Sequence, residues 1–428
     1  MSHKGHAERR HKPTRLDLLF VVMAALPACL GAISPQARAD ETKVTAKDGD
    51  GAFGRAAAPT SAEIQLPPGL QGPAGEGRLR LADVSGDSAD SPSVPAQYEP
   101  ASPSGSPAGG VLWWLMPPGR KGLRVFRLVA DKDAAPPAMT ASWDDRKKQA
   151  GVLEDKQPVL RYAQGATEPP AGISREFARG DYVSELFGPY GEALTEDYPK
   201  DHPHHRALNW SWATVRWKGQ TRDLFAVRGI WSRPVKMNRC AGGSVLAVID
   251  AENEWKWDDK DAVVHERVVI QVFRQAEGGR CIDVVLRLTP LVEELEFAGR
   301  LGAGYSGFNL RMAPGRGQQM LFHTDPPQAS RRRSWADYSA DFTGGKGRSG
   351  VAILQNATNP LYPSEWVKYP DLNFFQPGFP GPKLAAMPKG KTISLRYRLW
   401  IHRGTADEKT LSDQWAAYNA SWLQAADK

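Results

Sequence analysis

Hydrophobic and polar residues alternate along most of the second half of the chain, in short runs separated by Gly or Pro turns. A period of two, with many β-branched residues, is typical of strands that bury one face. From residue 158 onward we therefore predict a mainly β fold, a large antiparallel β-sandwich, with runs at 224–227, 244–249, 262–273, 282–288, 292–297, 351–354 and 392–401. The inward positions predict a core of Trp255, Val264, Val268, Ile270, Val272, Val284, Leu286, Leu395, Tyr397 and Leu399.

A helix is predicted at the C-terminal end of the chain. Thr405 and Glu408 have the spacing of a capping box. The large side chains that follow recur at helical spacing on one face: Leu411, Trp415, Tyr418 and Trp422. We expect this amphipathic stripe to pack against the sandwich.

A small antiparallel β-domain is predicted ahead of the sandwich, over residues 62–130. Its short β-like runs, at 63–66, 78–81, 111–115 and 123–128, are separated by stretches rich in Ser, Pro and Gly. Residues 40–61 contain almost no large apolar side chains, which predicts a disordered leader. Residues 131–157 are rich in Ala, Pro, Asp and Lys and are predicted as a linker, so the sandwich domain with its helix takes residues 158–428.

The first 39 residues have the pattern of a Sec-type signal peptide. Basic residues precede an apolar stretch at 18–30, and Ala37-Arg38-Ala39 is a small-residue cleavage site. We predict cleavage after Ala39 and a periplasmic or secreted protein. The alternative is a lipid anchor on Cys29, in the sequence Leu-Pro-Ala-Cys, although a proline at that place is unusual.

Removing this leader changes the charge balance. The whole chain carries a net charge of +7, and the leader contains six Lys/Arg and two acidic residues, so the remainder carries only +3. Residues 331–333 are the one tight Arg cluster, and a short charged run is more often a solvated face than a nucleic-acid site. We expect no nucleic-acid partner. No apolar run after the leader approaches the length of a membrane-spanning helix.

Two cysteines follow the leader, Cys240 and Cys281. An even pair in an oxidising compartment favours a disulfide. The alternative is two separate buried thiols, because spacing alone does not define bridge geometry.

Residues 197–206, which we call the histidine loop, concentrate the titratable chemistry of the chain. They read Asp-Tyr-Pro-Lys-Asp-His-Pro-His-His-Arg and hold three of the chain's nine histidines, His202, His204 and His205. The two prolines stiffen the backbone, and Asn-Trp-Ser-Trp shortly afterwards predicts a strand entering the core. The imidazoles could bind a divalent metal, act in acid–base catalysis, or cap turns in a buried loop. No certain cofactor is indicated.

The histidine loop is similar to the D-Y-P-x-D-H-P-H-H-R signature of the PmoA-like family of unknown function. Residues 182–191, 334–339, 356–366 and 395–404 also resemble segments of that family. The resemblance implies an exported β-sandwich protein related to the galactose-mutarotase-type supersandwich and found in carbohydrate-degrading bacteria. The methane-oxygenase label attached to some members does not suit this chain, because a membrane oxygenase subunit needs several spanning helices.

Three positions depart from the family pattern. Ala207 replaces a glycine, Ser306 replaces a glutamate that precedes the arginine aligned with Arg311, and Val367 begins a segment that usually carries a histidine. The missing glutamate removes the obvious base. Either the protein binds a ligand without converting it, or an acidic residue elsewhere, Asp201, Asp337 or Glu365, takes over that role.

Two hypotheses follow from the residues and the resemblance together. In the first, the protein is a carbohydrate-active enzyme of lyase, epimerase or hydrolase type, acting on a sugar or uronic acid. Its general acid would be His204 or His205, its base or orienting partner Asp201 or Asp337, and its ligand-binding residues His202, Arg206, Arg311, Trp335 and Trp366. In the second, it is a noncatalytic envelope protein that binds a small ligand or a metal. The oligomeric state is not indicated.

Overall fold

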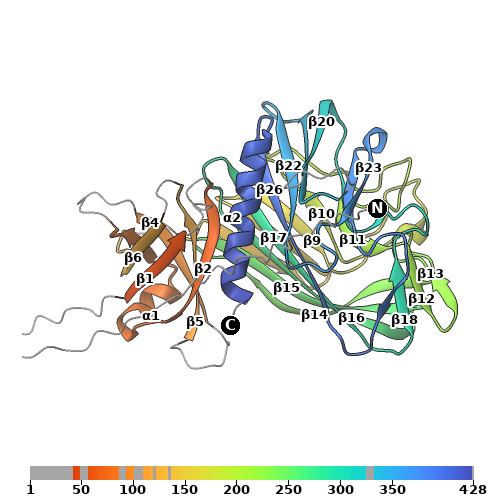
Figure 1. Ribbon diagram of the computed structural model, residues 1–428, viewed down its shortest axis with the longest axis horizontal. Coiled ribbons are helices and arrows are strands. Elements are labelled where there is room, and N and C mark those ends of the chain that lie inside the picture. Colours follow the sequence, from red (N-terminus) through yellow and green to blue (C-terminus); the bar gives the residue numbers. More distant parts are fainter. Residues whose placement is uncertain are drawn as a thin grey trace, which may run out of the picture.

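The computed structural model describes residues 42–48, 56–85, 93–100, 109–118, 122–133, 136–323 and 332–426, and side chains only as far as residue 420 at the C-terminal end. The fold is mainly β, as predicted. A small sheet, the long helix α2 and a large sandwich follow one another along the longest axis (Figure 1). The predicted signal peptide, Cys29 and the cleavage site after Ala39 lie outside the described residues, as does the side chain of Trp422.

The small β-domain is one six-stranded antiparallel sheet with strand order β1-β6-β3-β4-β5-β2. Alternate residues of β3 and β5 are buried, and the short helix α1 packs against β3, β4 and β6. Its elements are β1 (Thr42–Asp48), β2 (Ala58–Gln65), α1 (Pro68–Gly75), β3 (Leu79–Asp83), β4 (Ser93–Pro100), β5 (Gly109–Met116) and β6 (Gly122–Ala130).

The predicted disordered leader contains β1 and the first half of β2, so that prediction is wrong for the described part of residues 40–61. β1 pairs with β6 over its whole length, and its one large apolar residue, Val44, is buried. The cause is long-range pairing, which a polar local sequence does not reveal.

The large domain consists mainly of two eight-stranded antiparallel sheets that share one hydrophobic core. The first has the order β23-β24-β19-β11-β10-β9-β8-β7 and the second β14-β15-β16-β17-β26-β22-β21-β20. Phe308 stacks on Tyr397 at 4.4 Å, and the tilted rings of Trp212 and Trp255 lie 5.1 Å apart; both contacts join the two sheets. All ten residues predicted for the core lie in it.

The first sheet contains β7 (Met139–Asp144), β8 (Gln149–Glu154), β9 (Gln157–Ala163), β10 (Tyr182–Leu186), β11 (Leu208–Trp212), β19 (Ser306–Arg311), β23 (Glu365–Tyr369) and β24 (Phe374–Gly378). The second contains β14 (Ile230–Ala241), β15 (Leu246–Trp257), β16 (Asp261–Phe273), β17 (Gly279–Pro290), β20 (Gly315–His323), β21 (Trp335–Phe342), β22 (Ser349–Gln355) and β26 (Ile393–Arg403). A four-stranded sheet, β13-β12-β18-β25, adds β12 (Thr214–Trp217), β13 (Gln220–Arg222), β18 (Leu295–Ala298) and β25 (Ala385–Met387). Two 3-10 turns lie at Arg175–Phe177 and Pro370–Leu372.

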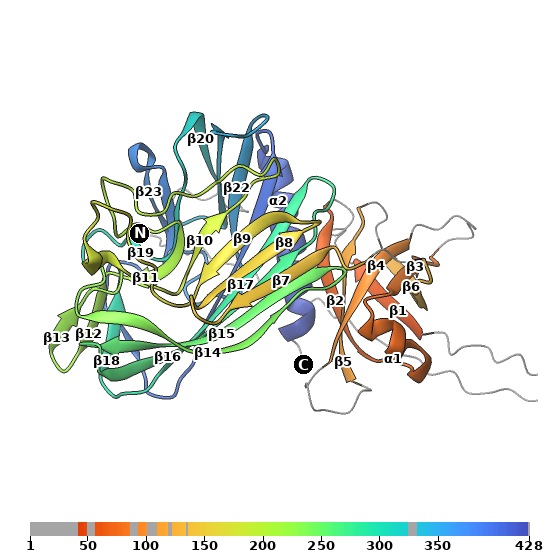
Figure 2. The same ribbon diagram turned by 180° about the vertical axis from the view of Figure 1, so that it is seen from behind.

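Most of the predicted linker is part of this sandwich. β7 and β8 fall within residues 131–157, and with β9 they run side by side across the face seen in Figure 2. Ala150 and Val152 of β8 are buried in the common core. The small and charged residues between them occupy the turn and the outward positions, which is why their composition resembled that of a linker.

Helix α2 (Glu408–Ala426) lies between the small sheet and the sandwich (Figure 1). Leu411 and Tyr418 are buried against the outer face of the second sheet, as the stripe predicted, whereas Ala417 joins the core of the small domain. The capping residue differs from the prediction: the Thr410 amide donates to the Asp407 carboxylate at 2.7 Å. Asp407 caps the helix because it lies directly before the first helical residue.

The two domains also meet through polar contacts. The side-chain oxygen of Gln97 in β4 accepts hydrogen bonds from the Val245 and Leu246 amides at 2.9 and 3.0 Å. Arg239 of β14 forms an ion pair with Glu99 of β4. Strand β4 of the small sheet is thus anchored to the ends of β14 and β15.

Cys240 and Cys281 are free thiols, so the predicted disulfide is absent. Cys240 lies in β14 and Cys281 in β17, with β15 and β16 between them. Three strand spacings separate the two Cα atoms by about 14 Å, beyond the reach of a disulfide. Burial raises the pKa of the Cys281 thiol to about 11.

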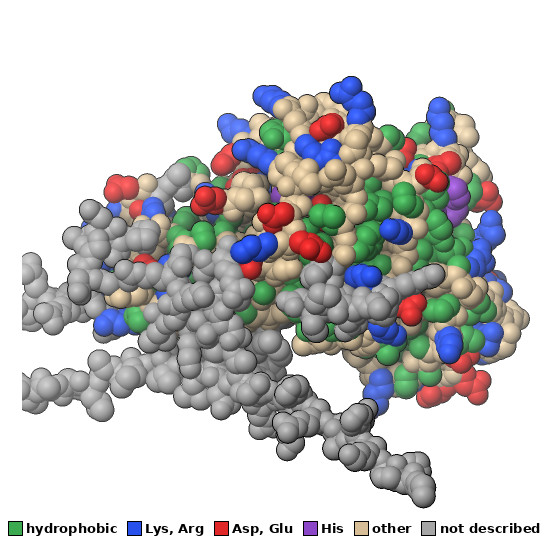
Figure 3. Space-filling model, turned by 45° about the horizontal axis from the view of Figure 1, so that its top comes forward, with side chains coloured by type: hydrophobic (Ala, Val, Ile, Leu, Met, Phe, Trp, Pro, Cys, Tyr) green, Lys and Arg blue, Asp and Glu red, His purple; other side chains and the backbone are tan. Residues whose placement is uncertain are grey.

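None of the helices in the described part of the chain is long and apolar enough to cross a membrane. On the face shown in Figure 3, basic and acidic side chains are interspersed rather than gathered by sign. The coloured part of this face, formed by described residues, therefore shows no basic patch of the kind that binds nucleic acid.

Candidate functional site

The histidine loop lies in the connection between β10 and β11, beside the end of β19. Asp197 and Arg206 pair as an isolated antiparallel bridge that closes the loop. The His205 amide donates to the His202 carbonyl at 2.8 Å, and Tyr198 adopts a positive φ of 53°. These contacts form a tight turn that keeps the three imidazoles together.

Arg206 holds this loop from inside and is fully buried. Its guanidinium donates to Asp197, to the Thr167 hydroxyl at 2.7 Å and to the Phe177 carbonyl at 3.2 Å. It also lies 3.4 Å from the centroid of the Tyr198 ring. We predicted that Arg206 contacts the ligand, but its donors are used within the protein, and its position is that of a structural clamp.

The three imidazoles form a stack with aromatic neighbours. The His205 ring lies between His202 at 4.7 Å and Phe374 at 4.8 Å, nearly parallel to both. The His204 ring meets His205 edge-on at 4.7 Å and Phe225 at 5.5 Å. His205 is buried, whereas His202 and His204 are half-buried. His202 and His204 are therefore the imidazoles that a ligand can reach.

Burial keeps two of these imidazoles neutral. It lowers the pKa of His204 to about 4, helped by the charges of His202, Arg228, Arg179 and Arg300. Burial and the neighbouring imidazoles lower the pKa of His205 to about 2. At neutral pH both rings are therefore unprotonated. The predicted role of general acid requires a protonated ring, and this geometry does not provide one.

Arg311 lies at the inner end of the site and was correctly placed beside the histidine loop. Its Nη2 donates to both oxygens of Asp201, at 3.0 and 3.1 Å, and its Nε donates to Glu196 at 3.2 Å. Its Nη1 lies 3.5 Å from Nδ1 of His205. Hydrogen bonds from His202 and Arg311 lower the pKa of Asp201, although partial burial opposes them. Asp201 is thus a carboxylate that orients Arg311, and it is not a proton donor.

Three arginines that the sequence did not single out surround His204. Arg179 is buried, and its Nε and Nη1 have no hydrogen-bond partner among the described residues. Arg228 and Arg300 are exposed, and Arg300 donates to the Tyr305 hydroxyl at 2.8 Å. Because all three charges lower the pKa of His204, the environment of this imidazole is cationic. No motif marks these residues, which come together only in the folded chain.

Asp223 is a further acidic residue near this group. Burial raises its pKa, while Arg300 and Arg228 act in the opposite direction. Its Oδ1 accepts a hydrogen bond from the Ala226 amide at 2.8 Å. Nothing in the sequence of the turn at residues 223–228 indicated that Asp223 would lie near Arg228 and Arg300.

Asp337 and Trp335 lie on a different surface of the molecule. Their neighbours in β21, Ala336 and Tyr338, face the core between the sheets, so Asp337 and Trp335 point to the opposite face, which α2 covers. Asp337 Oδ1 lies 2.9 Å from Nε2 of His402, and both residues are buried. We had predicted that Asp337 and Trp335 lie at the histidine loop, but the structure places them elsewhere.

Gly350 allows this buried pair to form. It lies between Asp337 and His402 on β22, and a Cβ there would come within 2.5 Å of Nε2 of His402. Because Gly350 has no side chain, the His402 imidazole can lie over it and contact Asp337.

Trp366 and Ser306 are also inside the protein. Trp366 is buried, stacks on Phe375 at 6.2 Å and donates to the Arg333 carbonyl at 2.8 Å. Ser306 is buried and donates to the Phe379 carbonyl at 3.2 Å. Trp366 thus packs the core instead of offering a face to a sugar.

A metal site at the histidine loop lacks support from the geometry. Among the residues that the structure describes, no group of three or more His, Cys, Asp or Glu side chains is arranged to hold a metal ion. His202, His204 and His205 stack or meet edge-on, and such contacts do not aim three nitrogen lone pairs at one point.

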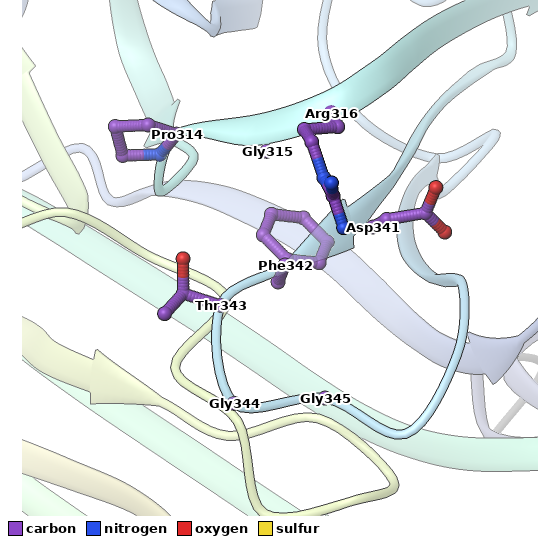
Figure 4. A pocket seen from close by; sticks show the side chains of 8 residues that line it. All are labelled: Pro314, Gly315, Arg316, Asp341, Phe342, Thr343, Gly344 and Gly345. Carbon is purple, nitrogen blue, oxygen red and sulfur yellow. The ribbon is translucent and has the colours of Figure 1, made fainter.

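None of four hollows found among the described residues is lined by the histidine loop. One, of about 540 Å³, lies at the β20–β21 edge. Figure 4 shows Arg316 from β20 and Asp341 and Phe342 from β21, with Thr343 in the turn that follows. No residue predicted for the site lines it.

Comparison with known proteins gives the family but no activity. No curated protein matches the chain. A family model described as a family of unknown function, DUF6807, matches residues 149–416, which include every strand of the sandwich from β8 to β26 and the first part of α2. The chain therefore belongs to this family of unknown function.

Proposed function

We propose that this is an exported carbohydrate-active protein whose histidine loop binds a sugar carrying a carboxylate, with neutral His204 as the base. The observation that carries the proposal is the position of His204, half-buried at the surface and surrounded by Arg179, Arg228 and Arg300. A cationic environment favours an anionic ligand, and a neutral imidazole can accept its proton.

The aromatic side chains near the loop support a sugar as the ligand. Phe225 and Phe374 lie within 5.5 Å of the imidazoles, and the half-buried Tyr305 ring lies 5.5 Å from Phe225. Aromatic faces with a few fixed polar groups are typical of sites for small ring-shaped ligands. The resemblance of this loop to the PmoA-like family, and through it to the mutarotase-type supersandwich, also supports a carbohydrate ligand.

Of the chemistries considered, removal of a carbon-bound proton next to a carboxylate fits these residues best. His204 would accept the proton, and the arginines would stabilise the negative charge that develops on the carboxylate. β-Elimination completes the step when the bond to the oxygen on the adjacent carbon breaks and that oxygen takes up the proton that His204 has just accepted; epimerisation completes it when water delivers a proton to the carbon from the other face and His204 releases its own proton to solvent. Hydrolysis needs a proton donor, which neither His204 nor His205 supplies near neutral pH.

The direct test is incubation of the protein with uronic-acid oligosaccharides while the ultraviolet absorbance of an unsaturated product, or the exchange of a carbon-bound proton, is followed. We expect turnover by the natural sequence and a loss of at least a hundredfold in His204→Asn. Lys391→Gln, an exposed lysine in the turn before β26, is the control that keeps full activity.

A second candidate function is noncatalytic binding of the same ligand. The buried, unpartnered nitrogens of Arg179 favour it, since they can hold a carboxylate without any base. Binding without product or exchange would support this candidate. Absence of both binding and turnover with every uronate would refute the proposal.

Export remains part of the proposal and rests on the predicted signal peptide. Its test is the N-terminal sequence of the protein recovered outside the cytoplasm, which we expect to begin at Asp40. A fatty-acylated Cys29 at the N-terminus would instead establish the lipid anchor.

A further inference from the structure

A second hollow lies on the same β10–β11 connection as the histidine loop, and we call it the Tyr190 hollow. It has a volume of about 580 Å³, within the range of roughly 300–1,000 Å³ that is usual for small-ligand sites. Its walls come from the β8–β9 turn, the β16–β17 turn, the turn after β21 and the end of β26. Residues important for its chemistry are Glu154, Tyr190, Gln275, Arg280, Lys346 and Arg403.

Tyr190 is held rigidly in this hollow. Its backbone amide donates to the buried Glu192 carboxylate at 2.8 Å, and that carboxylate also accepts from Ser349. The Gly191 amide donates to the Gly188 carbonyl at 3.0 Å and closes the turn. The aromatic ring is therefore positioned before any ligand arrives, which reduces the entropic cost of binding.

The cations of the hollow are only partly neutralised. Arg280 forms an ion pair with Glu154 at 2.6 Å, and both Glu154 oxygens accept from the Gln275 amide at 3.0 Å. Lys346 and Arg403 have no ion-pair partner among the described residues. Arg403 instead lies over the Tyr190 ring, 5.4 Å from its centroid. One acidic residue, the exposed Asp155, lies on the rim.

We propose that the Tyr190 hollow is a second subsite that binds an acidic unit of a saccharide chain, with its carboxylate at Lys346 and Arg403. The neutral side chains of Gln157 and Gln275 line the same space and supply amide groups for sugar hydroxyls. The identification of the ligand as a sugar rests on the proposed function. The site itself rests on the cavity, the fixed aromatic ring and the two cations without carboxylate partners.

The subsite extends the proposed function in one respect. A single uronate would occupy the histidine loop alone, whereas a chain of several units would also reach the Tyr190 hollow through the connection that carries both. The structure thus points to an acidic oligosaccharide, rather than a monosaccharide, as the preferred ligand, because two subsites on one rigid protein bind a linked ligand cooperatively.

The experiment is isothermal titration of the full protein with galacturonate and with oligogalacturonides of increasing length. Lys346→Gln combined with Arg403→Gln removes both cations of the hollow. Lys391→Gln is the control; Lys391 lies two residues before the eleven-residue strand β26, whereas Arg403 is at its far end, up to about 40 Å away. We expect the double variant to bind the longer chains at least tenfold more weakly, with galacturonate binding and thermal stability unchanged.

Three outcomes separate this inference from the proposed function. Equal affinity of the double variant and the natural sequence for the longer chains overturns the second subsite while leaving the histidine loop intact. Loss of galacturonate binding in His204→Asn alone supports the first site independently. Failure of the natural sequence to bind any of these ligands overturns both.

Discussion

Nε of Arg206 donates to Oδ1 of Asp197 over 2.5 Å, and the two residues form the bridge that closes the histidine loop. The arginine is completely buried, whereas the carboxylate is about one quarter exposed. The guanidinium also donates hydrogen bonds to Thr167 and Phe177, so one side chain connects three separate segments before β11. The buried Arg206 side chain therefore holds the loop in place and, with the ring contacts, fixes the positions of the imidazoles.

Arg206→Met should therefore destabilise the protein strongly. Removing one partner of a buried ion pair leaves Asp197 and two further acceptors unsatisfied, at a cost of about 3–5 kcal/mol. The measurement is the free energy of unfolding in urea. Arg175→Met, which removes an exposed pair with Glu168, is the control and should cost under about 1 kcal/mol. Similar values for the two variants would contradict the clamp.

Stability should fall as the pH falls below 6.5. The pKa of His204 is about 4 in the folded protein, against 6.5 for an unperturbed histidine. Between these values the unfolded chain binds a proton and the folded chain does not, so the stabilisation is complete above 6.5 and is lost on acidification. Each such imidazole contributes at most about 1.4 kcal/mol per pH unit.

Unfolding in urea between pH 7 and pH 4 measures this slope. His204→Asn should reduce it, and Lys391→Gln should leave it unchanged. A slope that is the same in all three proteins would show that His204 becomes protonated in the folded state as readily as in the unfolded chain.

Cys240 and Cys281 should both react with an alkylating reagent without prior reduction. Half-buried Cys240 should be modified slowly in the folded protein, whereas buried Cys281 should be modified only after unfolding. Peptide-resolved mass spectrometry distinguishes the two sites. Recovery of a peptide pair linked by a disulfide from freshly purified protein would contradict the sheet order between β14 and β17.

Gln97→Leu should weaken the attachment of the small domain. The substitution leaves the Val245 and Leu246 amides without their shared acceptor, at a cost of about 1–3 kcal/mol for each amide. Thermal unfolding followed by tryptophan fluorescence should show a lower transition temperature. Gln65→Leu, at an exposed position of β2, is the control. An unchanged transition in Gln97→Leu would show that apolar packing alone holds the domains together.

The sequence was sufficient for the core of the sandwich and for the apolar face of α2. Both depend on local periodicity, and Val268, Leu286 and Leu399 face inward at every second residue as expected. The sequence did not predict β1, because this polar segment forms a strand only through its pairing with the distant strand β6. The sequence also failed to show that Cys240 and Cys281 are far apart. The two strands between them in the sheet cannot be deduced from their spacing in the chain.

The site shows the same division between local and long-range information. The histidine loop was found because its chemistry is contiguous, and Arg311 and Asp201 do meet His205 there. Asp337 was assigned to the wrong surface, since its neighbours in β21 decide which way it points. Arg179 was missed because a buried cation without partners can be identified only after the strands around it are in place.

Helix α2 contributes Leu411 and Tyr418 to one hydrophobic cluster and Ala417 to another. Helix α2 leaves the ribosome after all the described strands of both domains. The small sheet therefore cannot bury its apolar surface fully until α2 has been synthesised. A nascent chain stopped before residue 408 would expose two apolar surfaces at once, so we expect chaperone dependence to be greatest just before α2 is made.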